Sequence, residues 1–359
     1  MSHTTIISED VPEVLEVNLK EGNEKPVLML SPPGVGKDDK VKEFCASQGM
    51  HLIDYRVTQK TPQDVRGFPM PNRETKKMEY MIDEDFDFRD DKPNCLFINE
   101  MLNGARATQP TLMQAVLDRR IGQFFFPKDT FTCAASNRVS DKTGVERMIA
   151  ALADRFSIFL VEPNLDSYLR YLENIGLYPE VYAYLQCNPE APYDYDIKKW
   201  DGESNFPTFR SFDRLGAMVN AFDNPRELAE HRLVVPLCQS KVGEKHGHMF
   251  ADFLKLTSQV GDVDKMLEDA DRCSIPNKID IVWLIACRLI SLANQNNLKQ
   301  VLTLAHRLTD PNKNNPDKLN SLESFVGTSI QRVKPDLTRT KVLLDWTIKH
   351  GDALSGKLD

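Results

Sequence analysis

The sequence predicts an α/β fold with a mostly parallel sheet, followed by a region made only of helices. Up to about residue 162, short apolar runs alternate with segments of helical periodicity, which is typical of a parallel sheet with crossover helices. After about Pro163, apolar residues recur only at helical spacing. We therefore expect an α/β core at the N-terminal end and a helical second half.

The expected strands are short apolar runs bounded by turn-forming residues. They fall at 26–30, 51–58, 95–98, 131–135 and 156–161. The expected helices fall at 11–20, 38–48 and 110–119 in the first half, and at 165–186, 208–222, 248–268, 277–293 and 298–308 in the second. Residues 60–93 are rich in Pro, Asp, Lys and Arg, so we expect loops and a small exposed insertion there.

The composition is that of a globular protein of 359 residues, with 41% hydrophobic and 27% charged residues. The net charge of −8 counts against nucleic-acid binding, which usually requires a basic excess. The seven cysteines include no C-x-x-C pair, which indicates reduced thiols in a cytoplasmic protein. The first ten residues lack the apolar stretch of a secretory signal, and no apolar run is long enough to span a membrane. We therefore expect a cytoplasmic protein without a membrane partner.

Residues 31–38 (SPPGVGKD) have the context of a phosphate-binding loop, because they lie between a predicted strand and a predicted helix. Gly34 and Gly36 allow the backbone N–H groups to point inward, and Lys37 can reach the terminal phosphates of a nucleotide. Asp38 stands where the motif usually has a Ser or Thr that binds Mg²⁺. On its own, so short a motif is equally compatible with an unrelated glycine turn. The residues expected to contact the nucleotide are Pro33, Gly34, Val35, Gly36, Lys37 and Asp38.

Residues 95–100 (CLFINE) resemble a Walker B motif, in which four apolar residues precede Asp-Glu. Such a strand delivers its last two side chains to the carboxyl edge of the sheet, where ligands bind. Glu100 keeps the position of the residue that polarises the attacking water. Asn99 replaces the carboxylate that normally supports Mg²⁺.

The two departures from the usual motifs can compensate for each other. The usual site has a neutral oxygen in the loop and a carboxylate on the strand, whereas this chain has Asp38 in the loop and Asn99 on the strand. Mg²⁺ prefers oxygen ligands and binds carboxylates directly. One hypothesis is therefore a transposed metal site, formed by Asp38 and Asn99, that still binds Mg-ATP. The alternative is a decayed site with weak or no nucleotide binding, and the sequence leaves both open.

Further segments occur in the order found in MoxR-like AAA+ ATPases, and the chain resembles this family over roughly residues 25–225. These segments are 61–69 (TPQDVRGFP), similar to the Asp-Leu-Arg-Gly-x-Pro stretch; 114–122 (QAVLDRRIG), similar to the helix and hairpin after Walker B; 132–138 (TCAASNR), similar to sensor 1; 148–156 (MIAALADRF), similar to the arginine-finger segment; and 206–212 (FPTFRSF), similar to sensor 2. No single segment is specific, but their ordered combination is.

The resemblance implies an AAA+ P-loop core at 1–162, a helical lid at 163–230 and a C-terminal helical extension at 231–359. It also implies an ATP-driven chaperone or remodeller that uses ATP and Mg²⁺, forms a hexameric ring and often works with a von Willebrand factor A domain partner.

The resemblance further implies a role for each matching polar residue. Asn137 would orient the attacking water together with Glu100. Arg155 would reach the site of the neighbouring subunit and stabilise charge in the transition state. Arg210 would contact the γ-phosphate from the lid. Taken singly, each arginine is better explained by a surface ion pair, and the functional roles are favoured only because the segments occur together in order.

Three functions compete at this point. The first is an ATP-hydrolysing remodeller of the MoxR type. The second is a structural or regulatory ring that binds nucleotide but hydrolyses it slowly or not at all, which Asp38 and Asn99 favour. The third is a nucleic-acid motor, which the acidic charge and the lack of a basic cluster disfavour.

Overall fold

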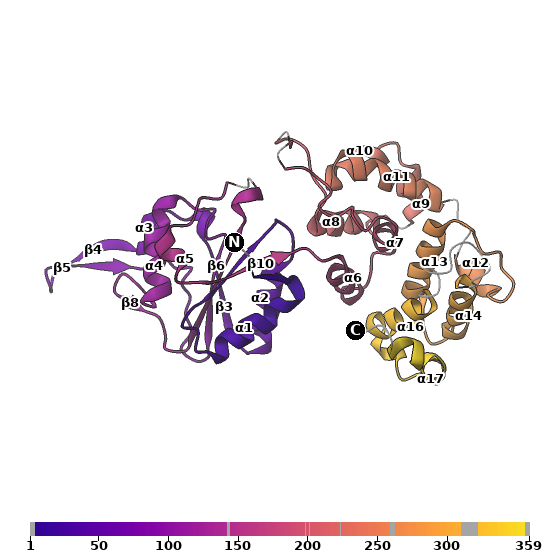
Figure 1. The fold of residues 1–359 in the computed structure, drawn as a ribbon, viewed down its shortest axis with the longest axis horizontal. Helices are drawn as coiled ribbons and strands as arrows, with labels where there is room; N and C mark the ends of the chain where they lie inside the picture. The colour runs from indigo at the N-terminus through magenta and orange to yellow at the C-terminus, as the bar shows by residue number, and fades with distance from the viewer. Residues whose placement is uncertain are drawn as a thin grey trace. The chain divides into compact units, whose positions relative to one another are not determined.

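The computed structural model describes residues 4–141, 144–197, 199–200, 202–222, 224–258, 263–309 and 322–355. The chain forms two compact units, of which the first holds Met1–Asn164 with Ile197–Lys199 and the second holds Leu165–Asp196 with Trp200–Asp359. The first unit contains a parallel sheet with helices, and the described residues of the second form helices and no strand, so the expected fold class is confirmed (Figure 1). The expected division of the helical half near residue 230 stays a prediction.

In the described part of the first unit, six strands form one parallel sheet in the order β1-β10-β2-β9-β6-β3. The strands are β1 (Thr5–Ile7), β2 (Val27–Ser31), β3 (His51–Arg56), β6 (Asn94–Asn99), β9 (Thr130–Asn137) and β10 (Ser157–Glu162). All five strands expected from the sequence are present, and β1 is an additional one. Because the strands are parallel, their carboxyl ends lie at one edge of the sheet and their amino ends at the other.

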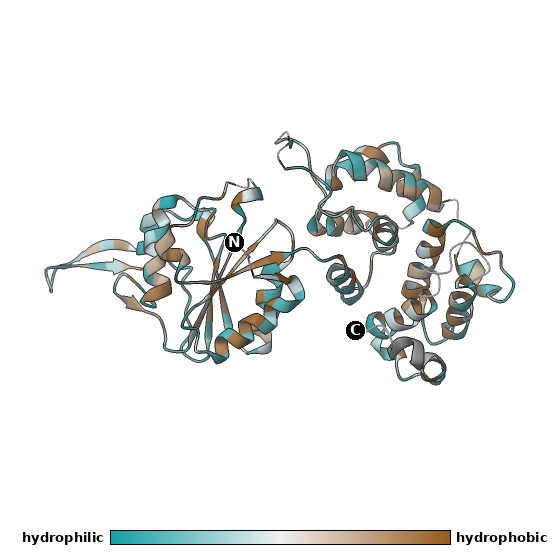
Figure 2. Cartoon of the chain, in the orientation of Figure 1, coloured by the Kyte–Doolittle hydropathy of each residue, from teal (hydrophilic) through white to brown (hydrophobic). Residues whose placement is uncertain are grey.

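Helices cover the sheet, and its central strands are therefore apolar along their length. All six residues of β6 are buried, as are seven of the eight residues of β9, and Figure 2 shows the hydrophobic residues along the strands. The helices of this unit are α1 (Val11–Lys20), α2 (Lys37–Ser47), α3 (Pro62–Arg66), α4 (Gln109–Leu117) and α5 (Ala150–Ala153).

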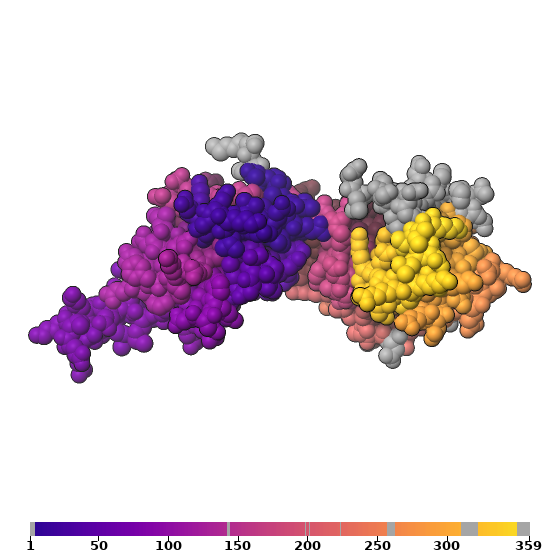
Figure 3. Space-filling view, turned by 90° about the horizontal axis from the view of Figure 1, so that it is seen from below, coloured from indigo at the N-terminus to yellow at the C-terminus, as the bar shows by residue number. Residues whose placement is uncertain are grey.

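The exposed insertion expected at 60–93 contains an antiparallel hairpin of β4 (Phe68–Asn72) and β5 (Lys77–Met81). This hairpin projects from the rest of the first unit (Figure 3). A second hairpin, of β7 (Arg120–Ile121) and β8 (Phe124–Phe125), follows α4. The sequence predicted the insertion but not its strands, since Pro69 and Pro71 argue against a strand when only the sequence is considered.

The described helices of the second unit share one continuous hydrophobic core that runs from Tyr168 to Trp346. They are α6 (Leu165–Asn174), α7 (Pro179–Cys187), α8 (Phe209–Val219), α9 (Pro225–Glu230), α10 (Val234–Val242), α11 (Glu244–Ser258), α12 (Val263–Glu268), α13 (Ile279–Leu292), α14 (Leu298–Leu308), α16 (Leu322–Val333) and α17 (Lys341–Ser355). None of the helices in the described ranges is long and apolar enough to cross a membrane. All seven cysteines are free thiols.

The single helix expected over 165–186 is two helices, α6 and α7. Gly176 adopts a φ of 104° and Leu177 a φ of 67°, which no continuous right-handed helix can contain. Pro179 then occupies the first position of α7, where its missing N–H costs nothing. The prediction of one helix was therefore wrong at the turn that the glycine and the proline form.

Asn23 joins the turn between α1 and β2 to the sheet, and we expect it to be important for stability. It is buried with a φ of 54°; its Nδ2 donates to the Thr132 carbonyl at 2.9 Å, and its Oδ1 accepts from the Thr132 N–H at 2.9 Å. Removing this amide leaves two buried backbone groups unpaired. Asn23→Ala should therefore lower the free energy of unfolding by about 2–3 kcal/mol in urea titrations. The exposed neighbour provides the control, since Glu24→Ala should change it by less than about 0.5 kcal/mol. Equal losses in both variants would contradict this role.

Candidate functional site

The carboxyl edge of the sheet brings together most of the residues that the sequence singled out. Ser31 at the end of β2 lies opposite Asn137 at the end of β9, and Asn99 at the end of β6 lies opposite Arg56 at the end of β3. Since β9 lies between β2 and β6, the phosphate-loop candidate, Asn137 and Glu100 follow one another along this edge. The predicted residues collected here are Pro33, Gly34, Val35, Gly36, Lys37, Asp38, Asn99, Glu100 and Asn137.

The loop between β2 and α2 has the conformation that a phosphate-binding loop requires. Gly34 and Gly36 adopt φ values of 78° and 90°, where residues with a Cβ are strained. Within the described residues, the backbone N–H groups of Gly34, Val35 and Gly36 donate to no acceptor. The space where a Cβ of Gly36 would point holds no protein atom within 4 Å.

The helix that follows the loop adds to its affinity for anions. The eleven-residue helix α2 begins at Lys37 and has no side-chain cap. The first N–H groups of a helix have no partner within the helix, and its dipole places partial positive charge there. Unpaired amides in front of such a helix form a site for phosphate or another anion.

Lys37 places a cation beside this loop. Its side chain is 11% exposed, and its Nζ lies 3.9 Å from Oδ1 of Asp38. This contact is longer than a direct hydrogen bond, and an ammonium group carries three N–H donors in all.

Asn99 lies between two carboxylates. Its Nδ2 donates to Oδ2 of Asp38 at 3.1 Å and to Oδ1 of Asp54 at 3.1 Å, while its Oδ1 accepts from the Glu100 N–H at 2.9 Å. Only the amide nitrogen can donate to the carboxylates and only the oxygen can accept from the N–H, so these bonds fix the orientation of the side chain. Asn99 thus presents hydrogens to the two carboxylates. For its oxygen to lie between the two carboxylates as a metal ligand, as the sequence suggested, the side chain would have to rotate and break these bonds.

Sequence reasoning missed Asp54. This residue lies on β3, its carboxylate is 27% exposed, and its Oδ2 accepts from the Arg56 guanidinium at 3.0 Å. A single acidic residue in an alternating strand carries no signal by itself. Only the strand order, which places β3 beside β6, brings it to Asn99.

Glu100 is held in an unusual backbone conformation at the end of β6. Its φ of 54° lies in the left-handed region, which costs energy for a residue other than glycine and is often found at functional sites. The hydroxyl of Thr58 donates to its Oε2 at 2.6 Å. The half-buried carboxylate is therefore held in one orientation, and one of its oxygens already accepts a hydrogen bond from Thr58. The sequence did not indicate a role for Thr58 at this site.

Asn137 occupies the position on the edge between the loop and Glu100. It is half-buried, and its side chain makes no hydrogen bond to any residue that the structure describes. An amide with unused donor and acceptor capacity at this place is suited to a water or a phosphate oxygen.

Arg155 lies at the opposite, amino edge of the sheet. It precedes β10, whose Ser157 pairs with Val27 at the start of β2, whereas the loop follows the other end of β2. A strand of this length spans about 15 Å, so Arg155 is remote from the loop of its own chain. The exposed guanidinium has no ion-pair partner in the described ranges.

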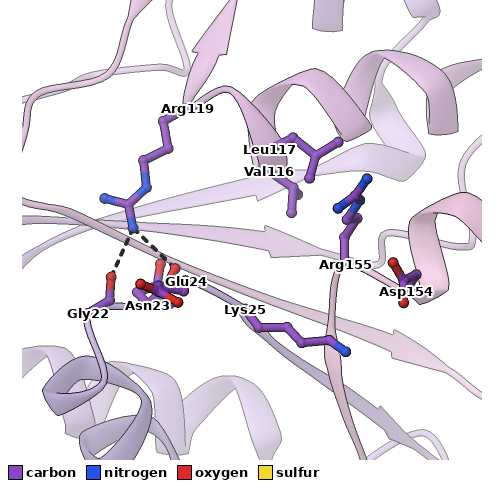
Figure 4. Close-up of a pocket in the computed structure, with 9 residues that line it drawn as sticks. All are labelled: Gly22, Asn23, Glu24, Lys25, Val116, Leu117, Arg119, Asp154 and Arg155. Carbon is purple, nitrogen blue, oxygen red and sulfur yellow. Dashed lines mark hydrogen bonds between the residues drawn. The ribbon is translucent and has the colours of Figure 1, made fainter.

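Arg155 lines a surface pocket of about 520 Å³ (Figure 4). Arg119 lies at the same pocket, but its Nη2 donates to the backbone oxygens of Gly22 and Asn23. The close-up shows these two bonds as dashed lines and shows Arg155 without any. The pocket is lined by Gly22, Asn23, Glu24, Lys25, Val116, Leu117, Arg119, Asp154 and Arg155.

Arg210 lies in the second compact unit. It is exposed in the first turn of α8, two residues after the Thr208 cap, whose hydroxyl accepts from the Ser211 N–H at 3.2 Å. The loop belongs to the first unit, so a contact between Arg210 and a phosphate stays a prediction.

Comparisons with known proteins give low similarities. The sequence matches no protein-family model and no curated protein. A RuvB variant from Thermotoga maritima has a TM-score of 0.36 and 15% identity, covering 78% of this chain and 81% of that chain. A candidate ATPase from Cytophaga hutchinsonii has a TM-score of 0.32 and 12% identity, covering 88% and 86% respectively. Similarity at this level assigns neither a family nor an activity to the chain.

Proposed function

We propose that this chain binds ATP at the carboxyl edge of its sheet and hydrolyses it, acting as a MoxR-like AAA+ remodeller of a partner protein. The observation that carries the proposal is the loop of unpaired amides, which lies at the same edge as Lys37, Asn137 and Glu100. A triphosphate supplies acceptors for these donors, and its negative charge is stabilised by the partial positive charge at the N-terminus of α2.

Each of these residues has a distinct task in the proposed reaction. The amides of 34–36 and the Lys37 ammonium hold and orient the phosphates. The Glu100 carboxylate accepts the proton of the attacking water, and Asn137 orients that water. Thr58 holds one oxygen of Glu100 in place.

The residues at this edge also fit the divalent cation that accompanies ATP. Asp38 lies in the first turn of the helix that follows the loop, and carboxylate oxygens are ligands that Mg²⁺ accepts. The cation would neutralise charge on the phosphates, with Asp38 as one of its protein ligands.

The position of Arg155 supports an assembly of several copies. This exposed arginine is remote from its own loop, and in a ring it would act on the phosphates of a neighbouring copy. We take the ring to be a hexamer and the client to include a von Willebrand factor A domain protein, both on the strength of the sequence resemblance. Arg210 would act on the γ-phosphate from the helical unit.

A ring that binds nucleotide without useful hydrolysis is the second candidate. Asn99 in place of the usual carboxylate and the bond from Thr58 to Glu100 are the observations that favour it. Phosphate release from ATP separates the two candidates. A nucleic-acid motor is disfavoured by the net charge of −8, and a salt-dependent DNA-binding assay tests it.

Nucleotide binding is tested by replacing the cation beside the loop. Lys37→Ala should weaken the binding of a fluorescent ATP analogue by about tenfold to a hundredfold, because hydrogen bonds to charged groups contribute about 1.5–3 kcal/mol. Lys42→Ala is the matched control on the same helix, since Lys42 is 56% exposed and pairs with Asp39. An equal, small effect of both substitutions would refute the assignment of the loop.

A further inference from the structure

We propose that the hairpin of β4 and β5 in one chain docks into a groove beside α1 of a second copy, so that each copy binds the next. The inference deepens the ring assembly of the proposed function, on which it rests, by naming the two surfaces that join neighbouring copies. Both surfaces lie in the first compact unit, and neither includes a residue of the nucleotide site.

One face of the hairpin is apolar and exposed to solvent. The strand register places Phe68 opposite Met81, and Met70 lies on the same face as Phe68 because side chains alternate along a strand. Phe68, Met81 and Met70 are 55%, 63% and 51% exposed, respectively. Single exposed apolar residues are common, whereas a group of them on one face is typical of a surface that binds another molecule.

The turn of the hairpin is basic. Residues 73–77 (RETKK) contain three basic residues and one acidic residue, which gives a net charge of +2. Arg73, Lys76 and Lys77 are exposed, and none of them forms an ion pair with a residue that the structure describes. The hairpin therefore offers an apolar face next to positive charge that the chain itself does not neutralise.

A groove of about 410 Å³ lies beside α1, and part of its lining is apolar. Val14 and Val17 of α1 line it together with Phe159 of β10. The side of α1 that packs into the core carries Val11 and Leu15 instead, and both are buried. Because Val17 is 49% exposed, the groove side of the helix has apolar surface that another molecule can cover.

The same groove is acidic. Asp10, Glu13 and Glu21 line it, and no basic residue does. Within the described part of the chain, Glu13 and Glu21 form no ion pair. Glu21 lies at the C-terminal end of α1, where the helix dipole disfavours negative charge, so a cation from another molecule would stabilise it. The groove thus complements the hairpin in both charge and apolar surface.

The hairpin does not reach the groove of its own chain. Gln123 of the second hairpin donates to the Met78 carbonyl at 3.3 Å, and the Arg66 guanidinium lies 5.3 Å from the centre of the Tyr80 ring. These contacts hold the hairpin against the rest of the unit. Figure 1 shows its tip at one end of the first unit and α1 well away from it. Contact between the two surfaces therefore requires two copies.

The groove also lies where the proposed ring needs a contact. Val27 and Ser157, at the amino ends of β2 and β10, line it, and Arg155 lies at this same edge of the sheet. In the neighbouring copy, the hairpin belongs to the segment that follows β3 at the carboxyl edge, where the phosphate loop lies. A contact between two different surfaces repeats from copy to copy and closes a ring when the rotation between copies allows it.

The test measures self-association of the full chain by analytical ultracentrifugation, with and without a non-hydrolysable ATP analogue. Lys76→Glu with Lys77→Glu reverses the charge of the hairpin, and Glu13→Lys with Glu21→Lys reverses that of the groove. Each double variant alone places like charges opposite each other, so its self-association should weaken at least about tenfold. Mixed in equal amounts, the two variants should associate again, because each hairpin then meets a groove of opposite charge.

Two matched controls reverse as many charges elsewhere in the same unit. Lys40→Glu with Lys42→Glu changes two lysines that pair with acidic residues of their own helix α2. Glu16→Lys with Glu43→Lys changes one carboxylate each on α1 and α2. None of these residues lines the groove or belongs to the hairpin, so each control should change self-association by less than about threefold.

A further variant tests the apolar contact and guards against misfolding of the groove variant. Phe68→Gln with Met81→Gln changes only exposed side chains of the hairpin, so the fold should be kept. Self-association should weaken at least about tenfold, because the apolar surface covered in the contact is lost.

The outcomes distinguish this inference from the proposed function. If the unaltered chain associates and the hairpin and groove variants associate equally well, these surfaces do not join the copies, although the ring and the nucleotide site stand. If each charge-reversed variant is impaired and their mixture does not recover, the hairpin and the groove do not bind each other, and the inference is overturned. If the unaltered chain remains a single copy in both conditions, the inference and the ring fail together.

Discussion

Glu100→Gln should reduce ATP turnover by about a hundredfold to ten-thousandfold, while the affinity for ATP changes by less than about threefold. The amide has almost the same shape as the carboxylate, but it cannot accept a proton from water. Its remaining oxygen still accepts from the Thr58 hydroxyl, which lies 2.6 Å from the carboxylate in the structure. Phosphate release and the binding of a fluorescent ATP analogue are measured on the same preparation.

The matched control for this substitution is Glu43→Gln. Glu43 lies on the exposed face of α2, where it pairs with Lys40 and is 60% exposed, so its loss should leave both measurements unchanged. If the unaltered protein hydrolyses ATP slowly and Glu100→Gln makes no difference, the ring that binds nucleotide without useful hydrolysis becomes the better account.

The strain at Glu100 connects this prediction to the fold. The left-handed backbone turns the chain directly after a completely buried strand, so the carboxylate leaves the core at the carboxyl edge. Asn99 supports the turn, because its side-chain oxygen accepts from the Glu100 N–H at 2.9 Å. The Asn99 side chain thus donates to the carboxylates of Asp38 and Asp54 and also supports the turn that positions Glu100. A change at residue 99 should therefore affect cation binding and turnover together.

The sequence predicted the fold class because it depends on patterns along the chain. The strands of the core are nearly uniformly apolar, and the apolar runs at 26–30 and 95–98 therefore indicated β2 and β6 within about a residue at each end. The loop glycines were predictable for a similar reason, since a positive φ strongly favours glycine. Periodicity alone did not reveal the turn at Gly176 and Leu177, which divides the helix expected over 165–186 into α6 and α7.

The sequence could not reveal contacts that depend on the strand order. Asp54 meets Asn99, and Thr58 meets Glu100, because β3 lies beside β6 at the edge of the sheet. The residues in these pairs are about forty positions apart in the chain, and each alone is an ordinary polar residue within or just after a strand. Asp38 and Asn99 were recognised as departures from a motif, whereas Asp54, to which Asn99 also donates, belongs to no motif.

The assembly is tested most directly at Arg155. Arg155→Ala should lower turnover by about a thousandfold or more without weakening ATP binding, as expected of an arginine that acts on the transition state from a neighbouring copy. Lys25→Ala provides a control in the same pocket, because Lys25 is also exposed there. Its effect should stay below about threefold, since exposed charges contribute little.

Mixing two inactive variants distinguishes action between copies from action within one copy. In a mixture of Arg155→Ala and Glu100→Gln chains, some sites combine an intact Glu100 with an intact Arg155 from the next chain. Random assembly of equal amounts should make about a quarter of the sites complete and restore turnover accordingly. Turnover that stays absent, although light scattering shows that the variants assemble, would mean that Arg155 does not serve a neighbouring site. Recovery would place it there, because the arginine and the phosphate loop lie at opposite edges of the sheet within one chain.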